Sequence, residues 1–92
     1  MTTIDDRSLV TRAEYAEFIE LDADRAILLD PKAGSYFEFN ATGGAVWRIL
    51  ERPSKIADIV EQLSSEFGGV VENEVTVFIE QLASRGLVAI PA

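Results

Sequence analysis

The segment from residue 34 to residue 50 changes its hydrophobic period at Asn40. Before Asn40 polar and apolar residues alternate, as in a β-strand, and after it apolar residues recur at helical spacing. The side-chain carbonyl of Asn40 is suited to accept hydrogen bonds from the first helical turn. We therefore expect a strand over residues 35–39 that runs directly into a helix over residues 41–51. The alternation turns Phe37 and Phe39 toward the core and leaves Tyr36 and Glu38 on the other face of the strand.

Two further strands are expected upstream of this segment. Residues 12–21 alternate imperfectly, and their glutamate spacing also suits a helix, but the β-branched and aromatic content favours a strand. Residues 25–30 form a short apolar run between turn residues, which predicts a strand buried on both faces or nearly so. Pro31 and Gly34 supply the fixed and the positive φ of a tight turn between this strand and the next. The three strands are expected to form an antiparallel meander.

Two more helices are expected downstream. Ser54 is positioned to cap a second helix, whose apolar stripe comprises Ile56, Val60, Leu63 and Phe67 and which Gly68–Gly69 ends. Val70–Val71 links it to a third helix over residues 73–85, after which Gly86 is suited to the C-terminal position. Residues 87–90 form either a short strand or an apolar segment that lies on the core.

Gly43 and Gly44 stand in the first turn of the first predicted helix. A glycine costs a helix interior about 1 kcal/mol relative to alanine. The pair therefore indicates a close approach between this turn and a neighbouring element, with a frayed first turn as the alternative.

Ninety-two residues are enough for one domain with a single modest core. We expect a flexible start over residues 1–10 and one domain over residues 11–90. The order of elements predicts an α+β, winged-helix-like fold in which a three-stranded antiparallel sheet is followed by a three-helix bundle.

Composition excludes several kinds of chemistry. The chain has no cysteine and no histidine, which removes disulfides, thiol nucleophiles, the usual general base and the commonest transition-metal ligand. Asp22, Asp24 and Asp30 do not follow the spacing of a calcium loop, so no metal and no cofactor is expected. A carboxylate enzyme would need a perturbed acid pair, and no candidate pair stands out.

The charge balance and the hydropathy bear on partners and location. Sixteen acidic and eight basic residues give a net charge of −8, and the third predicted helix is acidic on its outward face except for Arg85. This charge argues against a nucleic-acid partner, because phosphates require a basic protein surface. Salt-dependent binding to DNA would instead indicate a transcription factor. No run of 18 apolar residues and no secretion signal is seen, so a soluble, cytoplasmic protein without membrane contact is expected.

Two apolar side chains are expected on the surface. Val77 lies off the apolar stripe of the third helix, and Tyr36 lies on the outward face of its strand. Lone exposed apolar residues are ordinary. If the strand over residues 35–39 is an edge strand beside the third helix, however, its free main-chain groups offer a place for an extended peptide to add to the sheet.

From residue 26 to residue 88 the chain resembles the PqqD family, the leader-peptide-binding domains also called RiPP recognition elements. The resemblance is carried by an ordered set of short motifs. These are Ile27-Leu28-Leu29-Asp30, Gly34-Ser35-Tyr36-Phe37, Phe39-Asn40, Val46-Trp47 with Ile49-Leu50, then Ile56, Ile59-Val60, Leu63, Phe67, Glu74-Val75, Phe78-Ile79, Leu82 and Gly86-Leu87-Val88. The run Asn40–Gly43 is most similar to the stand-alone leader-binding protein of split lasso-peptide processing systems. Phe39, Glu74 and Arg52-Pro53 depart from the usual family residues, which leaves the subtype open.

The resemblance implies a non-catalytic function. The leader of a ribosomally made precursor would add as a strand beside the third strand and pack against the third helix, and a processing enzyme, either a leader protease or a radical SAM enzyme, would do the chemistry. Alternatives are a PqqD-type peptide chaperone for a radical SAM maturation enzyme and an acidic winged-helix interaction module. Either a monomer or a dimer is compatible with the sequence. The implied contact residues are Ser35, Tyr36, Phe37, Glu38, Glu74, Val77, Phe78 and Gln81.

Overall fold

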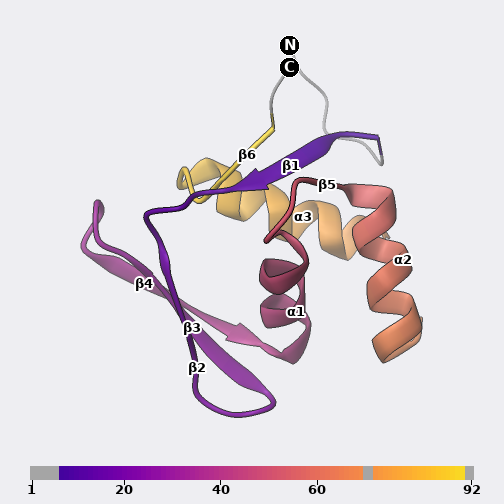
Figure 1. Ribbon diagram of the computed structural model, residues 1–92, viewed down its shortest axis with the longest axis horizontal. Helices are drawn as coiled ribbons and strands as arrows, with labels where there is room; N and C mark the ends of the chain where they lie inside the picture. Colours follow the sequence, from indigo (N-terminus) through magenta and orange to yellow (C-terminus); the bar gives the residue numbers. More distant parts are fainter. Residues whose placement is uncertain (1–6, 70–71, 91–92) are drawn as a thin grey trace.

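A computed structural model describes residues 7–69 and 72–90 of the chain. These residues form a mixed α+β structure of three helices and two three-stranded sheets, with strand orders β2-β3-β4 and β5-β1-β6 (Figure 1). The predicted α+β, winged-helix-like class is confirmed, although the second sheet was not foreseen. In chain order the elements are β1 (Leu9–Arg12), β2 (Glu17–Glu20), β3 (Arg25–Asp30), β4 (Ser35–Asn40), α1 (Ala41–Ile49), β5 (Ser54–Lys55), α2 (Ile56–Phe67), α3 (Glu72–Ser84) and β6 (Val88–Ala89).

Strands β2, β3 and β4 form the expected antiparallel meander. The β3–β4 turn is organised by the buried carboxylate of Asp30, whose Oδ1 accepts hydrogen bonds from the backbone N–H groups of Lys32 and Ala33 at 3.1 and 3.2 Å. Gly34 closes this turn with a φ of +67°. Strand β3 is fully buried on one face only, because Ile27 and Leu29 on its other face are half-buried.

The single strand expected over residues 12–21 is wrong. Residues 9–12 belong to β1, residues 17–20 belong to β2, and the segment between them is a turn. The backbone N–H of Ala13 donates to the carbonyl of Leu87 at 2.8 Å, and the Tyr15 hydroxyl donates to the carbonyl of Gly86 at 3.1 Å. Contacts with the far end of the chain thus divert this segment out of the meander, which the local residue pattern does not reveal.

The start of the ordered chain also differs from the expectation. Leu9 and Val10 lie in β1, and Val10 is fully buried, so the flexible start does not extend to residue 10. Residues 1–6 lie outside the described part of the chain, as does the predicted link Val70–Val71.

The start of α1 agrees with the prediction, whereas its end and the start of α2 do not. The side-chain oxygen of Asn40 accepts a hydrogen bond from the Gly43 N–H at 2.8 Å, which confirms Asn40 as the N-cap. Helix α1 ends at Ile49. Ser54 is not the cap of α2: its hydroxyl donates to the carbonyl of Arg52 at 2.9 Å, and its backbone pairs with β1.

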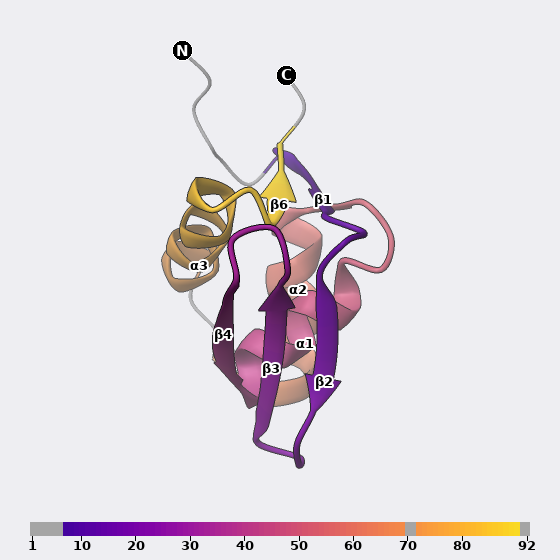
Figure 2. The ribbon, with the colours of Figure 1, turned by 90° about the vertical axis from the view of Figure 1, so that its left-hand side faces the viewer.

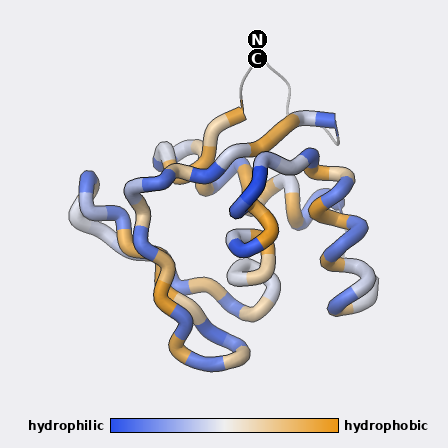
Figure 3. The backbone as a smooth tube through the Cα atoms, viewed as in Figure 1, coloured by the Kyte–Doolittle hydropathy of each residue, from blue (hydrophilic) through white to orange (hydrophobic). Residues whose placement is uncertain are grey.

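The core lies between the β2-β3-β4 sheet and the helices, with α1 in the middle (Figure 1). Hydrophobic residues concentrate along β3 and α1, and hydrophilic residues at the β3–β4 turn (Figure 3). Phe67, expected in the stripe of α2, is instead 40% exposed at the end of that helix. No helix within the described ranges is long and apolar enough to span a membrane.

Candidate functional site

Strand β4 is an edge of its sheet. It pairs with β3 along its whole length, and the strand order gives it no second neighbour among the described residues. Figure 2 shows β4 and β2 at opposite edges, with α3 beyond β4. In a paired strand the main-chain groups alternate in direction, so about half of those of β4 point toward the open edge.

Two aromatic contacts join α3 to β4. The rings of Phe78 and Phe39 meet edge to face with their centroids 5.4 Å apart. Just after the end of α3, the guanidinium of Arg85 lies over the ring of Phe37, 4.2 Å from its centroid. These contacts fix which face of α3 is turned to the strand, and Glu74 shares that face because it stands one turn before Phe78.

Two adjoining cavities lie along this junction. The larger, about 510 Å³, is lined by Arg25, Glu38, Phe39, Asn40 and Phe78. The smaller, about 240 Å³, is lined by Asn40, Thr42, Gly43, Val46, Glu74, Val75 and Phe78. Because they share Asn40 and Phe78, we treat them as one groove, the β4–α3 groove.

Gly43 is required by the close packing around this groove. A Cβ atom at Gly43 would lie 3.3 Å from both Phe39 Cβ and Phe78 Cζ, whereas one at Gly44 would have no neighbour nearer than 3.7 Å. The close approach predicted for the glycine pair is therefore present at Gly43, while Gly44 has ordinary contacts.

The groove brings some of the predicted contact residues together. Glu38 and Phe78 line the larger cavity, and Glu74 lines the smaller one. Val77 is 45% exposed, as predicted, and Gln81 is exposed one turn further along α3.

Five predicted residues lie outside the groove lining: the exposed Val77 and Gln81 of α3, and three residues of β4. The half-buried ring of Phe37 is covered by Arg85. Tyr36, 64% exposed, and Ser35 line a separate hollow of about 270 Å³ on the opposite face of the sheet. The predicted set thus divides among the groove, the exposed side of α3 and the part of β4 outside the groove.

Several groove residues were missed as site residues. Asn40 and Gly43 had a sequence signal, but it was interpreted only as helix capping and close packing. Arg25 had none, because the β3–β4 register that sets it opposite Asn40 depends on the turn. Arg85, which covers Phe37 beside the groove, has no signal in the sequence beyond being the one basic residue at the end of the third predicted helix.

Charges at the groove are exposed and mostly acidic. Arg25 approaches Asp22 at 3.4 Å and Glu38 at 3.9 Å. The hydrogen bond from the Asp24 backbone, followed by the neighbouring Arg25, lowers the pKa of Asp22. Exposed pairs of this kind contribute little to stability. The side chains of Glu38, on β4, and Glu74, on α3, stand on either side of the groove.

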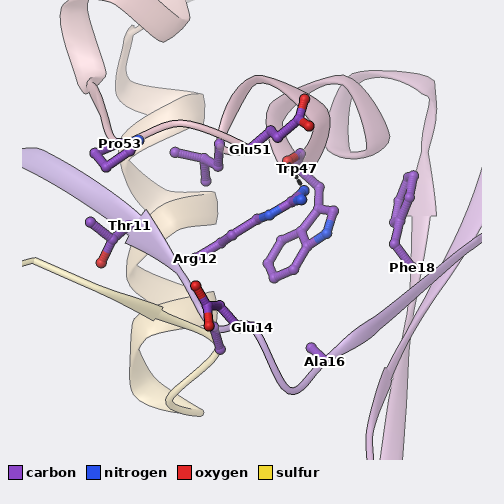
Figure 4. Close-up of a pocket in the computed structure, with 10 residues that line it drawn as sticks. Thr11, Arg12, Glu14, Ala16, Phe18, Trp47, Glu51 and Pro53 are labelled. Atoms are coloured by element: carbon purple, nitrogen blue, oxygen red, sulfur yellow. Dashed lines mark hydrogen bonds between the residues drawn. The ribbon is translucent and has the colours of Figure 1, made fainter.

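A second cavity, of about 500 Å³, lies between the β1–β2 connection and the end of α1 (Figure 4). Arg12 crosses it, donating from Nη1 to the carbonyl of Trp47 at 2.9 Å and lying over the indole ring at 5.3 Å. The carboxylates of Glu14 and Glu51 flank this arginine. None of the predicted contact residues lines this cavity.

The chain matches the family model described as "Coenzyme PQQ synthesis protein D (PqqD)" over residues 25–88. Among solved structures it is similar to "TbiB1 in Complex with the TbiA(beta) Leader Peptide", with 26% identity and a TM-score of 0.72 over 89% of this chain and 98% of that one. It also shares a fold with "Heterocyclase in complex with substrate and Cofactor", with 17% identity and a TM-score of 0.65 over 92% of this chain but only 11% of that one. No curated protein matches. Since the family model spans more than half of its length, this chain belongs to the PqqD family.

Proposed function

We propose that this chain is a non-catalytic recognition domain for the leader of a ribosomally made precursor peptide. The leader adds to the β2-β3-β4 sheet as a strand along β4, packs against α3, and is presented to a separate processing enzyme. The observation that carries the proposal is the open edge of β4 beside a groove, in a PqqD-family chain similar to the leader-bound TbiB1.

The geometry supports strand addition because the two requirements of that binding mode lie side by side. Main-chain groups at the open edge of β4 give affinity, and flanking apolar pockets give side-chain specificity. Phe78 supplies an aromatic wall to both cavities, and Gly43 leaves room at the smaller one. The contact surface that we propose comprises Ser35, Tyr36, Phe37, Glu38, Glu74, Val77, Phe78 and Gln81.

The processing chemistry is assigned to the partner enzyme. The chain lacks histidine and cysteine, and no cluster of three or more metal-ligating side chains occurs within residues 7–69 and 72–90. Asp22 and Asp30 each bond their own turn instead. The resemblance of the Asn40–Gly43 run directs the proposal to a lasso-peptide system, whose partner is a leader protease.

The test is fluorescence polarisation with a labelled leader of the precursor encoded with this chain, using the TbiA(beta) leader as a reference. We expect Val77→Asp to weaken binding at least about tenfold, equivalent to ~1.4 kcal/mol. The matched control is Ile19→Asp on the opposite edge, because Ile19 is 43% exposed against 45% for Val77. Circular dichroism checks that both variants fold. Equal binding by wild type and Val77→Asp would remove α3 from the site.

A second experiment tests strand addition itself. Leaders that are N-methylated at alternate residues lose one set of amide donors each. Because only every second amide of an added strand faces β4, one set should abolish binding and the other should leave it nearly unchanged. Equal effects from both sets would contradict binding as a strand.

A further inference from the structure

The outer face of the β2-β3-β4 sheet is uncovered by any described element. Figure 2 looks directly onto this face, with all three helices behind the sheet. The strand registers place Ile19 beside Ile27, and Leu29 beside Tyr36, on this side. Ile19 is 43% and Tyr36 64% exposed, while Ile27 and Leu29 are half-buried. We call these four residues the outer apolar row.

Carboxylates lie on three sides of the outer apolar row, and the β3–β4 turn on the fourth side carries Lys32. Glu17 and Glu38 belong to the same face, and Asp22 and Asp24 stand at the β2–β3 turn. Arg25 already approaches Asp22 and Glu38, and the ammonium of Lys32 lies over the ring of Tyr15. Beside the row, the hollow of about 270 Å³ is bounded by Glu17, Leu29 and Tyr36. The face therefore has an apolar centre, a shallow recess and an acidic rim.

This charge pattern selects the kind of occupant. A second copy of the chain would bring the same carboxylates against this face and would carry the same net charge of −8. Like charges facing one another oppose association, whereas a positive rim complements a negative one. The complementary surface is an apolar patch ringed by lysine and arginine.

The outer face lies next to the β4 edge, which indicates that its partner also contacts the bound leader. A leader strand along β4 would extend the sheet, and alternate leader side chains would then lie on the same side as Tyr36 and Glu38. A protein seated on the outer apolar row would therefore contact the chain and its bound leader together.

We propose that the outer sheet face is the docking surface for the enzyme that processes the bound precursor. This proposal rests on the proposed function, because the leader completes the surface. The enzyme presents an apolar patch ringed by basic residues to Ile19, Leu29 and Tyr36, with Glu17 and Glu38 at the rim.

The experiment measures binding of the processing enzyme encoded with the precursor to the immobilised chain, with and without saturating leader. Ile19→Glu should weaken enzyme binding at least about tenfold, since it sets a charge in the apolar centre. The matched control is Phe67→Glu, whose side chain is 40% exposed at the far end of α2. Glu17→Lys should lower the association rate and reduce its dependence on salt. Saturating leader should strengthen enzyme binding by the wild type.

The outcomes separate this proposal from the proposed function. Leader affinity, measured by fluorescence polarisation, should stay within about twofold for Ile19→Glu, because Ile19 stands on β2, at the opposite edge of the sheet from β4. Enzyme binding that is insensitive to Ile19→Glu overturns the docking surface even where the leader binds well. A dimer in sedimentation that Ile19→Glu dissociates overturns it in favour of self-association. Failure of any leader to bind the wild type overturns the proposed function instead.

Discussion

The two edges of the β2-β3-β4 sheet are both open among the described residues, but their surroundings differ. Strand β4 has six residues and runs beside α3, with a groove between them. Strand β2 has four residues and carries Glu17 and Glu20, and the cavity beside it, lined by Phe18 and Trp47, is crossed by Arg12 (Figure 4). Short, charged edges are a common protection against unwanted pairing. The β4 edge, which is longer and is joined to α3 by an open groove, is therefore the better candidate for strand addition.

The same asymmetry extends into the core. Phe39 on β4 contacts four other aromatic rings, those of Phe18, Phe37, Trp47 and Phe78, at centroid distances from 5.4 to 6.4 Å. On the β2 side, α1 is held by the surface ion pair of Arg48 and Glu20 at 2.8 Å. Strand β4 is therefore supported by the rings around the buried Phe39, whereas β2 contributes one ring, that of Phe18, and an exposed ion pair to α1.

The largest effect is expected from Phe39→Ala. Removing a buried phenylalanine costs about 3–5 kcal/mol, whereas Phe18→Ala on β2 should cost less because Phe18 is only half-buried. Urea denaturation of both variants measures the difference. Equal losses of unfolding free energy would mean that the packing of the two strands contributes equally to stability.

The second-largest effect is expected from a comparison of the two turns of the sheet, whose aspartates should contribute unequally to the free energy of unfolding. Asp30 is 2% exposed and bonds two backbone N–H groups, so Asp30→Ala should lower the free energy of unfolding by about 1–3 kcal/mol. Asp22 is exposed, and Asp22→Ala should change it by no more than about 0.5 kcal/mol. Thermal or urea unfolding tests this, and a larger loss for Asp22→Ala would reverse the ranking.

Adjacent glycines of α1 allow a sharper comparison. Gly43→Ala places a methyl group 3.3 Å from Phe39 and Phe78 and should weaken leader binding by shifting Phe78. Gly44→Ala meets Phe18 at 3.7 Å, and its higher helix propensity should leave stability unchanged or raise it by up to about 1 kcal/mol. Fluorescence polarisation and urea denaturation, measured for both variants, test the pair. Equal leader affinity and equal stability of the two variants would show that Phe78 can move away from the added methyl group without a loss of binding or stability.

The smallest effect is expected in the dependence of unfolding free energy on pH under acidic conditions. Because the folded-state pKa of Asp22 lies below its ordinary 3.8, the carboxylate contributes stability above that value and loses it as the pH falls through the lower folded pKa. Asp22→Asn should therefore flatten the dependence of unfolding free energy on pH slightly, in denaturation between about pH 5 and pH 3. A steeper dependence in the variant would contradict the lowered pKa.

Features that depend on neighbouring residues were predictable from the sequence. The alternation in β4, the cap at Asn40 and the exposure of Val77 each follow from spacing within a few residues. The sheet of β5, β1 and β6 was not predictable, because β1 pairs with segments far along the chain. The composition of the groove was partly missed for the same reason: the strand register brings Arg25 there, and the packing of α3 on β4 brings Arg85 near it.

The central position of β1 has a consequence for how the chain folds. Thr11 lies beside Ala89, so this pairing closes a loop of 78 residues. The β2-β3-β4 hairpins and the strand-to-helix junction at Asn40 involve contacts between near neighbours, which form faster than contacts between distant residues. We expect β4 to form early in folding. The pairing of β1 with β6 should be the last and slowest step.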